Sequence, residues 1–456
     1  MSHDALVLGA GPGGTAAARE LAVAGRRVGL IEMAQWGGTC LNRGCIPTKL
    51  LLGAVAPLHL ARAQERLRTL RGVPETDYGT IHTRTTRFLT ASSQALAKSL
   101  QAAGVELIPG RAALAGRHTV RVQDAGGTER ILEAGHIIIA TGSRNAAFPG
   151  LVPDGQAVLD STMLLELSER PESLLVIGAG AIGLELGDFF AALGTKVTIV
   201  EAAPHIAPSE DADIAAEMAR ATAKAGKTCI TGVKAKEIIT RGGQAELTLE
   251  DGRILTAEKA LVAVGRAPNT AGLGCELAGI SLNRRGFIVV DGNLLAAPDI
   301  YAVGDINGLT LLAHAAEHQA SYVVRRILGQ IDAPYASGPM PSCIYGSTEL
   351  MRAGKTAREA LQSGGAVSVS VSPLSLNAIA QASGVSTGFV KAVWEADRLV
   401  GMAAVGHGVS HLVTVAQMLV AAGHTYNAPL PVMFAHPTLD ESVAAALRAP
   451  RKPAAE

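Results

Sequence analysis

The sequence ALVLGAGPGGTAAARELAVAGRRVGLIE, residues 5–32, decides the fold of the first part of the chain. A short apolar strand precedes a glycine-rich turn, an alanine-rich helical pattern follows it, and a second apolar strand ends in Glu32. This order predicts a βαβ unit with a G-x-G-x-x-G turn, in which backbone N–H groups at the start of the helix can approach a pyrophosphate closely. The glycines of this turn are Gly9, Gly11 and Gly14.

The same pattern recurs in SLLVIGAGAIGLELGDFFAALGTKVTIVE, residues 173–201. In both copies an acidic residue lies 23 positions after the first glycine, where a carboxylate can accept hydrogen bonds from ribose hydroxyls. In the second copy this acid is Glu201, which would repel a 2′-phosphate, so the sequence predicts NAD rather than NADP. The glycines of the second turn are Gly178, Gly180 and Gly183.

Composition limits the function classes. The 456 residues suffice for about three domains. Lys and Arg together number 40, as do Asp and Glu, so we expect no broad basic surface for nucleic acid or an anionic membrane. Apolar runs are short and broken by Gly or charged residues, none approaches the ~18 residues of a membrane span, and no signal-peptide pattern opens the chain. We therefore expect a cytoplasmic protein whose partners are small molecules or proteins.

Three further apolar strands end in glycine turns, within residues 136–143, 260–270 and 300–308. Ligands of open α/β sheets bind at such carboxyl ends of strands. Asp305 is therefore a candidate to accept a hydrogen bond from a ribitol or ribose, with an Asx-type turn as the alternative. From about residue 341, alternating segments and helical stretches indicate a further α+β domain.

The segment GGTCLNRGCIPTK, residues 37–49, places Cys40 and Cys45 five positions apart. In an undistorted helix the two side chains would point about 140° apart, so the segment must bend, and Pro47 together with Gly44 predicts the bend. A distorted short-loop disulfide is typically a reducible one. In a reducing compartment such a pair is more often catalytic or metal-binding than a structural disulfide.

A zinc site is the alternative for the cysteine pair. It would need a second pair at suitable spacing, but the other cysteines are isolated, so we expect them to be small core residues and expect no metal. HAAEH, residues 314–318, fits a zinc-protease pattern, and His407 and His411 are four apart without an evident third ligand; we expect both pairs to be structural or solvent-facing. The isolated cysteines are Cys229, Cys275 and Cys343.

The stretch FAHPTLDESVAAAL, residues 434–447, carries a candidate acid–base pair. Imidazole can take and return a proton near neutral pH, and Pro437 favours an extended backbone at His436, just ahead of a helix. Glu441 could accept from the other ring nitrogen and fix the tautomer. Thr438 and Glu441 also satisfy the T-x-x-E capping box, so these residues alone leave both roles for Glu441 open.

Together these segments resemble the class I flavoprotein disulfide reductases. The cysteine segment, the two glycine turns, ATGS, VGRAPNT and YAVGDI occur in the same order as in that family and cover nearly the whole chain. The resemblance implies an α/β fold with two Rossmann-like dinucleotide-binding domains and a C-terminal α+β dimerisation domain that forms a homodimer. It assigns FAD to residues 1–145 and 271–340, NAD to residues 146–270, and the interface to residues 341–456.

The resemblance also implies roles for single residues. Cys40 would form a mixed disulfide with the substrate, and Cys45 would pass electrons to FAD. His436 would serve as acid and base at the disulfide of the other subunit, with Glu441 orienting it. Further expected site residues are Lys49 and Glu185, paired beside the flavin, and the cofactor-binding Thr141, Gly142, Gly265, Asp305 and Ala313.

Within the family the sequence is most similar to the members that oxidise dihydrolipoamide. This similarity implies dihydrolipoamide or a lipoyl-domain protein as the partner. Arg43 stands where many relatives have an apolar residue, directly beside the cysteines, and could favour a carboxylate-bearing disulfide instead. The alternatives are an NADH-dependent reductase of another small disulfide and a non-catalytic flavin-binding subunit of a complex.

Overall fold

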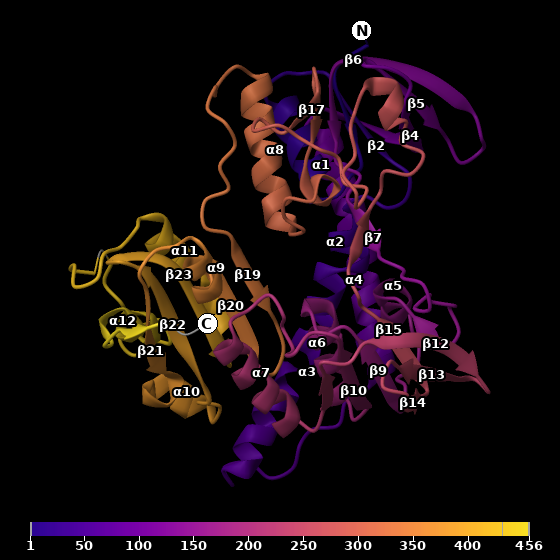
Figure 1. The fold of residues 1–456 in the computed structure, drawn as a ribbon. Helices are drawn as coiled ribbons and strands as arrows, with labels where there is room; N and C mark the ends of the chain where they lie inside the picture. The colour runs from indigo at the N-terminus through magenta and orange to yellow at the C-terminus, as the bar shows by residue number, and fades with distance from the viewer. Residues whose placement is uncertain (1, 431, 455–456) are drawn as a thin grey trace. The chain divides into compact units, whose positions relative to one another are not determined.

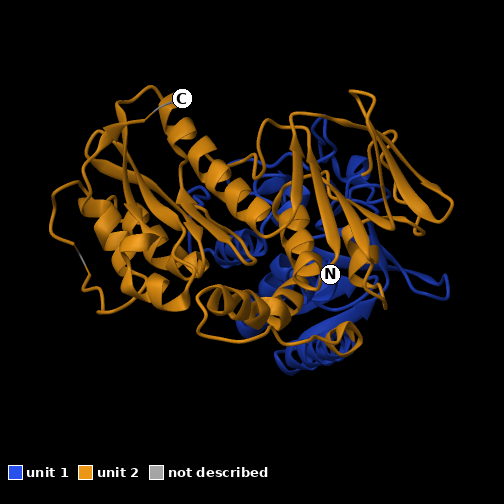
Figure 2. Cartoon of the chain, turned by 90° about the horizontal axis from the view of Figure 1, so that it is seen from below, with its two compact units in different colours: residues 1–47, 83–146, 265–337 blue, residues 48–82, 147–264, 338–456 orange. Residues whose placement is uncertain are grey.

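The computed structural model describes residues 2–430 and 432–454. The chain folds into two compact units, each assembled from segments that are far apart in the sequence (Figures 1 and 2). Each unit contains one of the two glycine turns, and unit 2 also contains the C-terminal sheet. Unit 1 comprises residues 1–47, 83–146 and 265–337, and unit 2 comprises residues 48–82, 147–264 and 338–456.

Unit 1 is built on a mainly parallel sheet with the central strand order β18-β6-β1-β2-β3. β1 (His3–Leu8) lies between β2 (Val28–Glu32) and β6 (Glu129–Ile139) and runs parallel to both. Both faces of β1 are buried, which explains its nearly continuous apolar sequence. The other strands are β3 (Val105–Pro109), β4 (Arg111–Leu114), β5 (Thr119–Gln123), β7 (Ser143–Asn145), β16 (Arg266–Pro268), β17 (Leu295–Ala297) and β18 (Ile300–Ala302).

Two helices of unit 1 pack side by side: α1 (Pro12–Val23), which follows β1, and α8 (Ala313–Ile327) (Figure 1). Pro12 occupies the first turn of α1, where its missing N–H would have had no helical partner. Small buried residues of α1, such as Ala17, allow this close packing. The unit also contains α2 (Gly38–Arg43), most of α4 (Tyr78–Ala102), and the short 3₁₀ helices η1 (Cys275–Ala278) and η2 (Gly304–Asn307).

Unit 2 contains a second parallel sheet, with the strand order β11-β10-β9-β15-β8. β9 (Ser173–Ile177), α6 (Ala181–Ala192) and β10 (Lys196–Glu201) form its βαβ unit, as the sequence predicts. Its other elements are most of α3 (Cys45–Arg66), β8 (Val158–Leu159), α5 (Ser161–Leu165), α7 (Ala212–Lys224), β11 (Thr228–Thr231), β15 (Lys259–Val262) and the antiparallel strands β12 (Ala235–Arg241), β13 (Gln244–Leu249) and β14 (Ile254–Ala257).

The C-terminal part of unit 2 is an antiparallel sheet with helices, in the strand order β19-β20-β23-β22-β21-β24. The expected fold class is therefore confirmed: two nucleotide-type α/β sheets and a C-terminal α+β region. Its elements are β19 (Pro341–Ile344), β20 (Glu349–Gly354), α9 (Ala357–Gln362), β21 (Val367–Pro373), η3 (Leu374–Leu376), α10 (Ala378–Ser383), β22 (Gly388–Glu395), β23 (Arg398–Gly406), η4 (Val409–Leu412), α11 (Val413–Ala421), α12 (Glu441–Arg448) and β24 (Lys452–Pro453).

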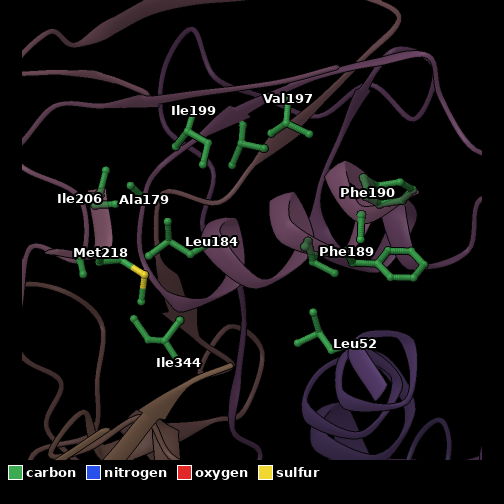
Figure 3. Packing of buried hydrophobic residues seen from close by; sticks show 14 of the residues in the cluster. Leu52, Ala179, Leu184, Phe189, Phe190, Val197, Ile199, Ile206, Met218 and Ile344 are labelled. Carbon is green, nitrogen blue, oxygen red and sulfur yellow. The ribbon is translucent and has the colours of Figure 1, made fainter. Parts of the chain in front are cut away.

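One hydrophobic cluster joins α3, the second parallel sheet and the C-terminal sheet within unit 2. Leu52 of α3 faces the side of α6 that carries Phe189, and Ile344 of β19 lies near Leu184 and Met218 (Figure 3). These side chains are buried, so the three parts share a single core.

The segment Gly38–Arg66 is the one part of residues 2–430 and 432–454 long and apolar enough to span a membrane. It covers 29 residues and contains an 18-residue window with a mean hydropathy of 1.3, so the expectation that no segment approaches this limit is wrong by composition. The segment is, however, divided at Gly44, and its side chains Leu52 and Val55 are buried in the core. Core helices of globular proteins meet the same criterion, so this is weak evidence for a membrane span.

Charged side chains also join the start of α7 to the C-terminal sheet. The Nζ of Lys391, a side chain with 3% exposure on β22, lies 2.7 Å from Asp211 and 2.6 Å from Asp213. Burial raises the pKa of Asp211, but the ammonium of Lys391 and the N–H groups of Ala357 and Arg358 outweigh it and hold the pKa below its ordinary value. The carboxylate therefore remains ionised and needs its cation.

We expect Lys391→Met to lower the free energy of unfolding by about 3 kcal/mol, because the buried carboxylate of Asp211 loses its counter-ion. Urea denaturation followed by circular dichroism measures the change. Arg220→Gln is the matched control, since Arg220 pairs with Glu217 on the exposed surface of α7 and should cost less than about 0.5 kcal/mol. Equal stability of the two variants would contradict the role of Lys391.

Candidate active site

The first glycine turn connects β1 to α1 in unit 1. Gly9 has φ +100°, a conformation that other residues rarely adopt. A Cβ at Gly11 would meet no protein atom within 4 Å, so this side of the turn is open. Glu32, at the end of β2, accepts hydrogen bonds from the N–H groups of Ala10 and Ala34, both at 2.8 Å. Its carboxylate is thereby fixed against the turn.

The second turn, in unit 2, repeats this arrangement closely. Gly178 has φ +103°, and a Cβ at Gly180 would again meet nothing within 4 Å. Glu201, at the end of β10, accepts from the N–H groups of Ala179 at 2.7 Å and Ala203 at 2.8 Å. The two acids singled out by their spacing therefore occupy equivalent positions in the two units.

Each turn has the features that an adenine dinucleotide requires. A helix N-terminus with unsatisfied N–H groups attracts a pyrophosphate, and the open side at Gly11 or Gly180 lets it approach the backbone. Each oxygen of Glu32 and Glu201 has one hydrogen bond from the backbone and can still accept one from a ribose hydroxyl. Both turns therefore fit a dinucleotide.

A polar network in unit 1 holds Asp305, which lies in η2. The hydroxyl of Ser143 donates to the Asp305 carboxylate, and the Nε of Arg266 donates to the same hydroxyl at 2.6 Å and lies 3.6 Å from the carboxylate. The recorded partners of the Asp305 carboxylate are thus these side chains, not the backbone N–H of an Asx turn. Sequence reasoning missed Ser143 and Arg266, although both belong to quoted motifs.

The remaining predicted cofactor residues of unit 1 lie around this network. Asn269, which directly follows β16, is bound to the segment that contains Thr141. Its side-chain N–H donates to the Thr141 carbonyl at 2.8 Å, and its backbone N–H donates to the Gly142 carbonyl at 3.0 Å. Gly265 has φ +131° and directly precedes β16. Ala313 is the first residue of α8.

Cys40 and Cys45 form a close pair on two different helices. Cys40 is half-buried in α2, and Cys45 is the exposed first residue of α3. The expected bend lies at Gly44, where a Cβ would be 3.1 Å from the Thr39 carbonyl oxygen. Pro47 is instead in the first turn of α3, where a helix needs no N–H donor, so it does not cause the bend.

Lys49 and Glu185 lie in contact within unit 2, although 136 residues separate them in the sequence. The Lys49 ammonium donates to Glu185 Oε2 at 2.6 Å; the Glu185 side chain is only 4% exposed, whereas that of Lys49 is 38% exposed. Burial raises the pKa of Glu185, and Lys49 and the N–H of Tyr345 oppose the shift only in part. These two donors therefore favour the ionised carboxylate against the effect of burial.

His436 and Glu441 also lie in contact, with 2.9 Å between His436 Nδ1 and Glu441 Oε1. The other oxygen of Glu441 accepts from the N–H of Thr438 at 3.0 Å, and both bonds lower the pKa of Glu441. The Thr438 hydroxyl donates to the Ala435 carbonyl, and the N-cap of α12 is Asp440, so the complete capping box is not formed. The His436 side chain is 79% exposed and can reach a reacting group.

The other histidine and cysteine candidates have separate environments, except that Cys343 interacts with Tyr345, Lys49 and Glu185. His314 and His318 are exposed on α8, and His318 contacts the Tyr335 hydroxyl at 3.1 Å. Cys275 is buried, whereas Cys229 and Cys343 are half-buried at the margins of the core clusters. Among residues 2–430 and 432–454, no group of three or more His, Cys, Asp or Glu side chains could hold a metal ion.

Comparison with known families gives two matches along the chain. Residues 3–320 match the family described as pyridine nucleotide-disulphide oxidoreductase, and residues 340–447 match its dimerisation domain. Among curated proteins, the dihydrolipoyl dehydrogenase of Chlorobaculum tepidum is 37% identical over 447 residues, which cover 96% of this chain and 95% of that one. That of Thermus scotoductus is 36% identical, over 99% and 98% of the two chains.

Two solved structures extend the likeness to the complete fold. LpdA from Mycobacterium tuberculosis is 29% identical, with a TM-score of 0.89 over 97% of this chain and 99% of that one. RclA from Escherichia coli, described as an HOCl-induced flavoprotein disulfide reductase, is 30% identical, with a TM-score of 0.85 over 97% and 99%.

We expect Arg266→Gln to weaken the binding of FAD about tenfold, because Ser143 and Asp305 lose the charged donor that orders them. Titration of the apoprotein with FAD, followed by flavin fluorescence, measures the dissociation constant. Arg285→Gln is the control, since Arg285 is exposed in the same unit and stacks only on Phe287. Equal dissociation constants for both variants would show that Arg266 has no such role.

Proposed function

We propose that this chain, which belongs to the pyridine nucleotide-disulphide oxidoreductase family, oxidises dihydrolipoamide with NAD⁺ through the Cys40–Cys45 pair. In the net reaction a dithiol and NAD⁺ give a disulfide, NADH and a proton. The observation that carries the proposal is the cysteine pair at the junction of α2 and α3, in a chain with two dinucleotide turns. The relatives named dihydrolipoyl dehydrogenase support lipoamide as the disulfide.

FAD is proposed for the first turn and NAD for the second. In unit 1, Glu32 would bind the adenosine ribose, and Asp305, held by Ser143 and Arg266, would accept from the ribitol. In unit 2, Glu201 lies fixed at the end of β10, where its negative charge disfavours the 2′-phosphate of NADP.

When bound, FAD supplies the two-electron acceptor that passes a hydride on to the nicotinamide. The chain itself supplies the sulfur and proton chemistry. In the oxidised protein, where a disulfide joins the two cysteines, a substrate thiolate attacks Cys40 and breaks that bond, which releases Cys45 as a thiolate. The second substrate thiolate then displaces Cys40 and closes the substrate disulfide. Lys49 provides a positive charge four residues after Cys45 on the same helix, which favours the thiolate form.

His436 is proposed to take the proton of the incoming thiol. Glu441 accepts from Nδ1, which leaves Nε2 as the proton acceptor. The match of residues 340–447 to a dimerisation domain supports a homodimer, and in the resembling family the histidine serves the disulfide of the other subunit. The high exposure of His436 in the single chain agrees with a role across that interface.

We expect Cys45→Ser to abolish NADH-driven reduction of lipoamide, because a hydroxyl cannot form the disulfide or carry its electrons. FAD should remain bound, and its absorbance should still fall when NADH is added without oxygen. The rate of NADH oxidation and the flavin spectrum provide the two measurements.

Cys229→Ala is the control for this variant, because Cys229 lies at the margin of the unit 2 core and should leave the rate within about twofold of the parent. Full activity of Cys45→Ser would disprove the disulfide mechanism. Flavin that binds but is not reduced by NADH in the parent protein would favour the non-catalytic alternative.

A second candidate substrate, a disulfide that carries a carboxylate, is favoured by Arg43. Arg43 ends α2 between the two cysteines, its side chain is exposed, and no ion pair or hydrogen bond is recorded for it within residues 2–430 and 432–454. An unpaired guanidinium is a bidentate partner for a carboxylate. The likeness to RclA, described as a flavoprotein disulfide reductase, is compatible with such a substrate.

Lipoate and lipoamide differ only in a carboxylate and an amide, so together they test Arg43. We expect Arg43→Val to raise KM for lipoate about threefold, the effect of one exposed ion pair, and to leave KM for lipoamide unchanged. Steady-state rates at low and high salt provide the check, because high salt screens the ion pair and should make the KM for lipoate equal in the parent protein and in Arg43→Val. Equal KM values for lipoate in the two proteins would exclude a contact between Arg43 and the carboxylate.

A further inference from the structure

The turn Tyr345–Gly346–Ser347, which follows β19, is bound to two carboxylates of α6. The N–H of Tyr345 donates to Glu185 Oε1 at 3.1 Å, and the N–H and hydroxyl of Ser347 both donate to Asp188 at 2.7 Å. Gly346 has φ +146°, and a Cβ there would lie 2.9 Å from Asp188 Oδ2. The turn can therefore approach α6 this closely only with glycine at its centre.

The carboxylate of Asp188 binds this turn through Ser347 and stays ionised. Lys227, itself buried, donates to its carboxylate, and His59 Nε2 lies 3.2 Å away. Burial by itself would raise the pKa of Asp188, but these neighbours, with Lys227 the strongest, outweigh burial and lower it below its ordinary value. The carboxylate stays charged and keeps the donors of Ser347, which fixes the position of Tyr345.

Tyr345 holds the Lys49–Glu185 pair from two sides. Its backbone N–H orients Glu185, and its ring lies 4.8 Å from Lys49 Nζ, within the range of a cation–π contact. Burial raises the pKa of the Tyr345 hydroxyl to about 12, so the ring stays a neutral phenol. The long Lys49 side chain, more than a third exposed, is thus restricted by a carboxylate and an aromatic face together.

We propose that Tyr345 is a positioning residue for Lys49, and that it sets how strongly the Lys49 ammonium stabilises the reduced flavin. The proposal rests on the proposed function, with Lys49 and Glu185 paired beside the flavin as the family resemblance implies. A cation held near the flavin favours its electron-rich form, and a mobile cation favours it less. Tyr345 acts through the side chain of Lys49.

The test is the two-electron midpoint potential of the bound flavin, measured by anaerobic titration with a reference dye. Tyr345→Leu removes the ring but keeps the N–H that donates to Glu185. We expect the equilibrium constant for flavin reduction to fall about fivefold, which for two electrons is a potential about 20 mV more negative. Tyr345→Phe keeps the ring and should retain the parent potential, which rescues the effect and controls for folding.

A double-mutant cycle separates positioning from general structural damage. Lys49→Met should itself make the potential more negative, and Tyr345→Leu should have no further effect in the Lys49→Met protein. Additive shifts, an unchanged potential in Tyr345→Leu, or an equal loss in Tyr345→Phe would each overturn the proposal while the proposed function stands. An unchanged potential in Lys49→Met would refute the placement of Lys49 beside the flavin, and the proposal would fall with it.

Discussion

Both nucleotide turns depend on how closely a helix can approach the strand before it. A Cβ on Gly14 would collide with the carbonyl of Gly9, and the second turn has the same constraint between Gly183 and Gly178. Glycine therefore permits the packing that presents the N-termini of α1 and α6 at the carboxyl ends of the two sheets. The acid at the end of each following strand then binds the middle residue of the turn, so that strand, turn and helix form one rigid element.

The fold class could be predicted from the sequence because its signals are local. Each βαβ unit shows an apolar strand, a glycine turn and a helical period within about thirty residues, and the structure has these elements at residues 3–32 and 173–201. The apolarity of α3 is the exception. Its window resembles a membrane span, and only the burial of side chains such as Leu52 assigns it to the core.

The contacts of the site could be predicted only in part. The spacing predicted the place of Glu32 at the end of its strand but not its hydrogen bond to the turn, and the pairing of Lys49 with Glu185, 136 residues apart, came from the family resemblance. The bend of the cysteine segment lies at Gly44, because a proline in a first helical turn disturbs nothing. Contacts such as that of Ser143 with Asp305 arise when distant loops meet in the folded chain, and no local pattern encodes them.

Helix α6 starts at the glycine turn of unit 2, and Glu185 lies one turn further along it. The turn proposed to bind the nicotinamide nucleotide and the carboxylate that binds Lys49 thus belong to one helix, about 6 Å apart along its axis. If α6 tilts when a nucleotide binds at its turn, the Lys49 ammonium bound to Glu185 moves with it. The proposed nucleotide turn and the carboxylate that binds Lys49 are therefore connected directly through one helix, with no loop between them.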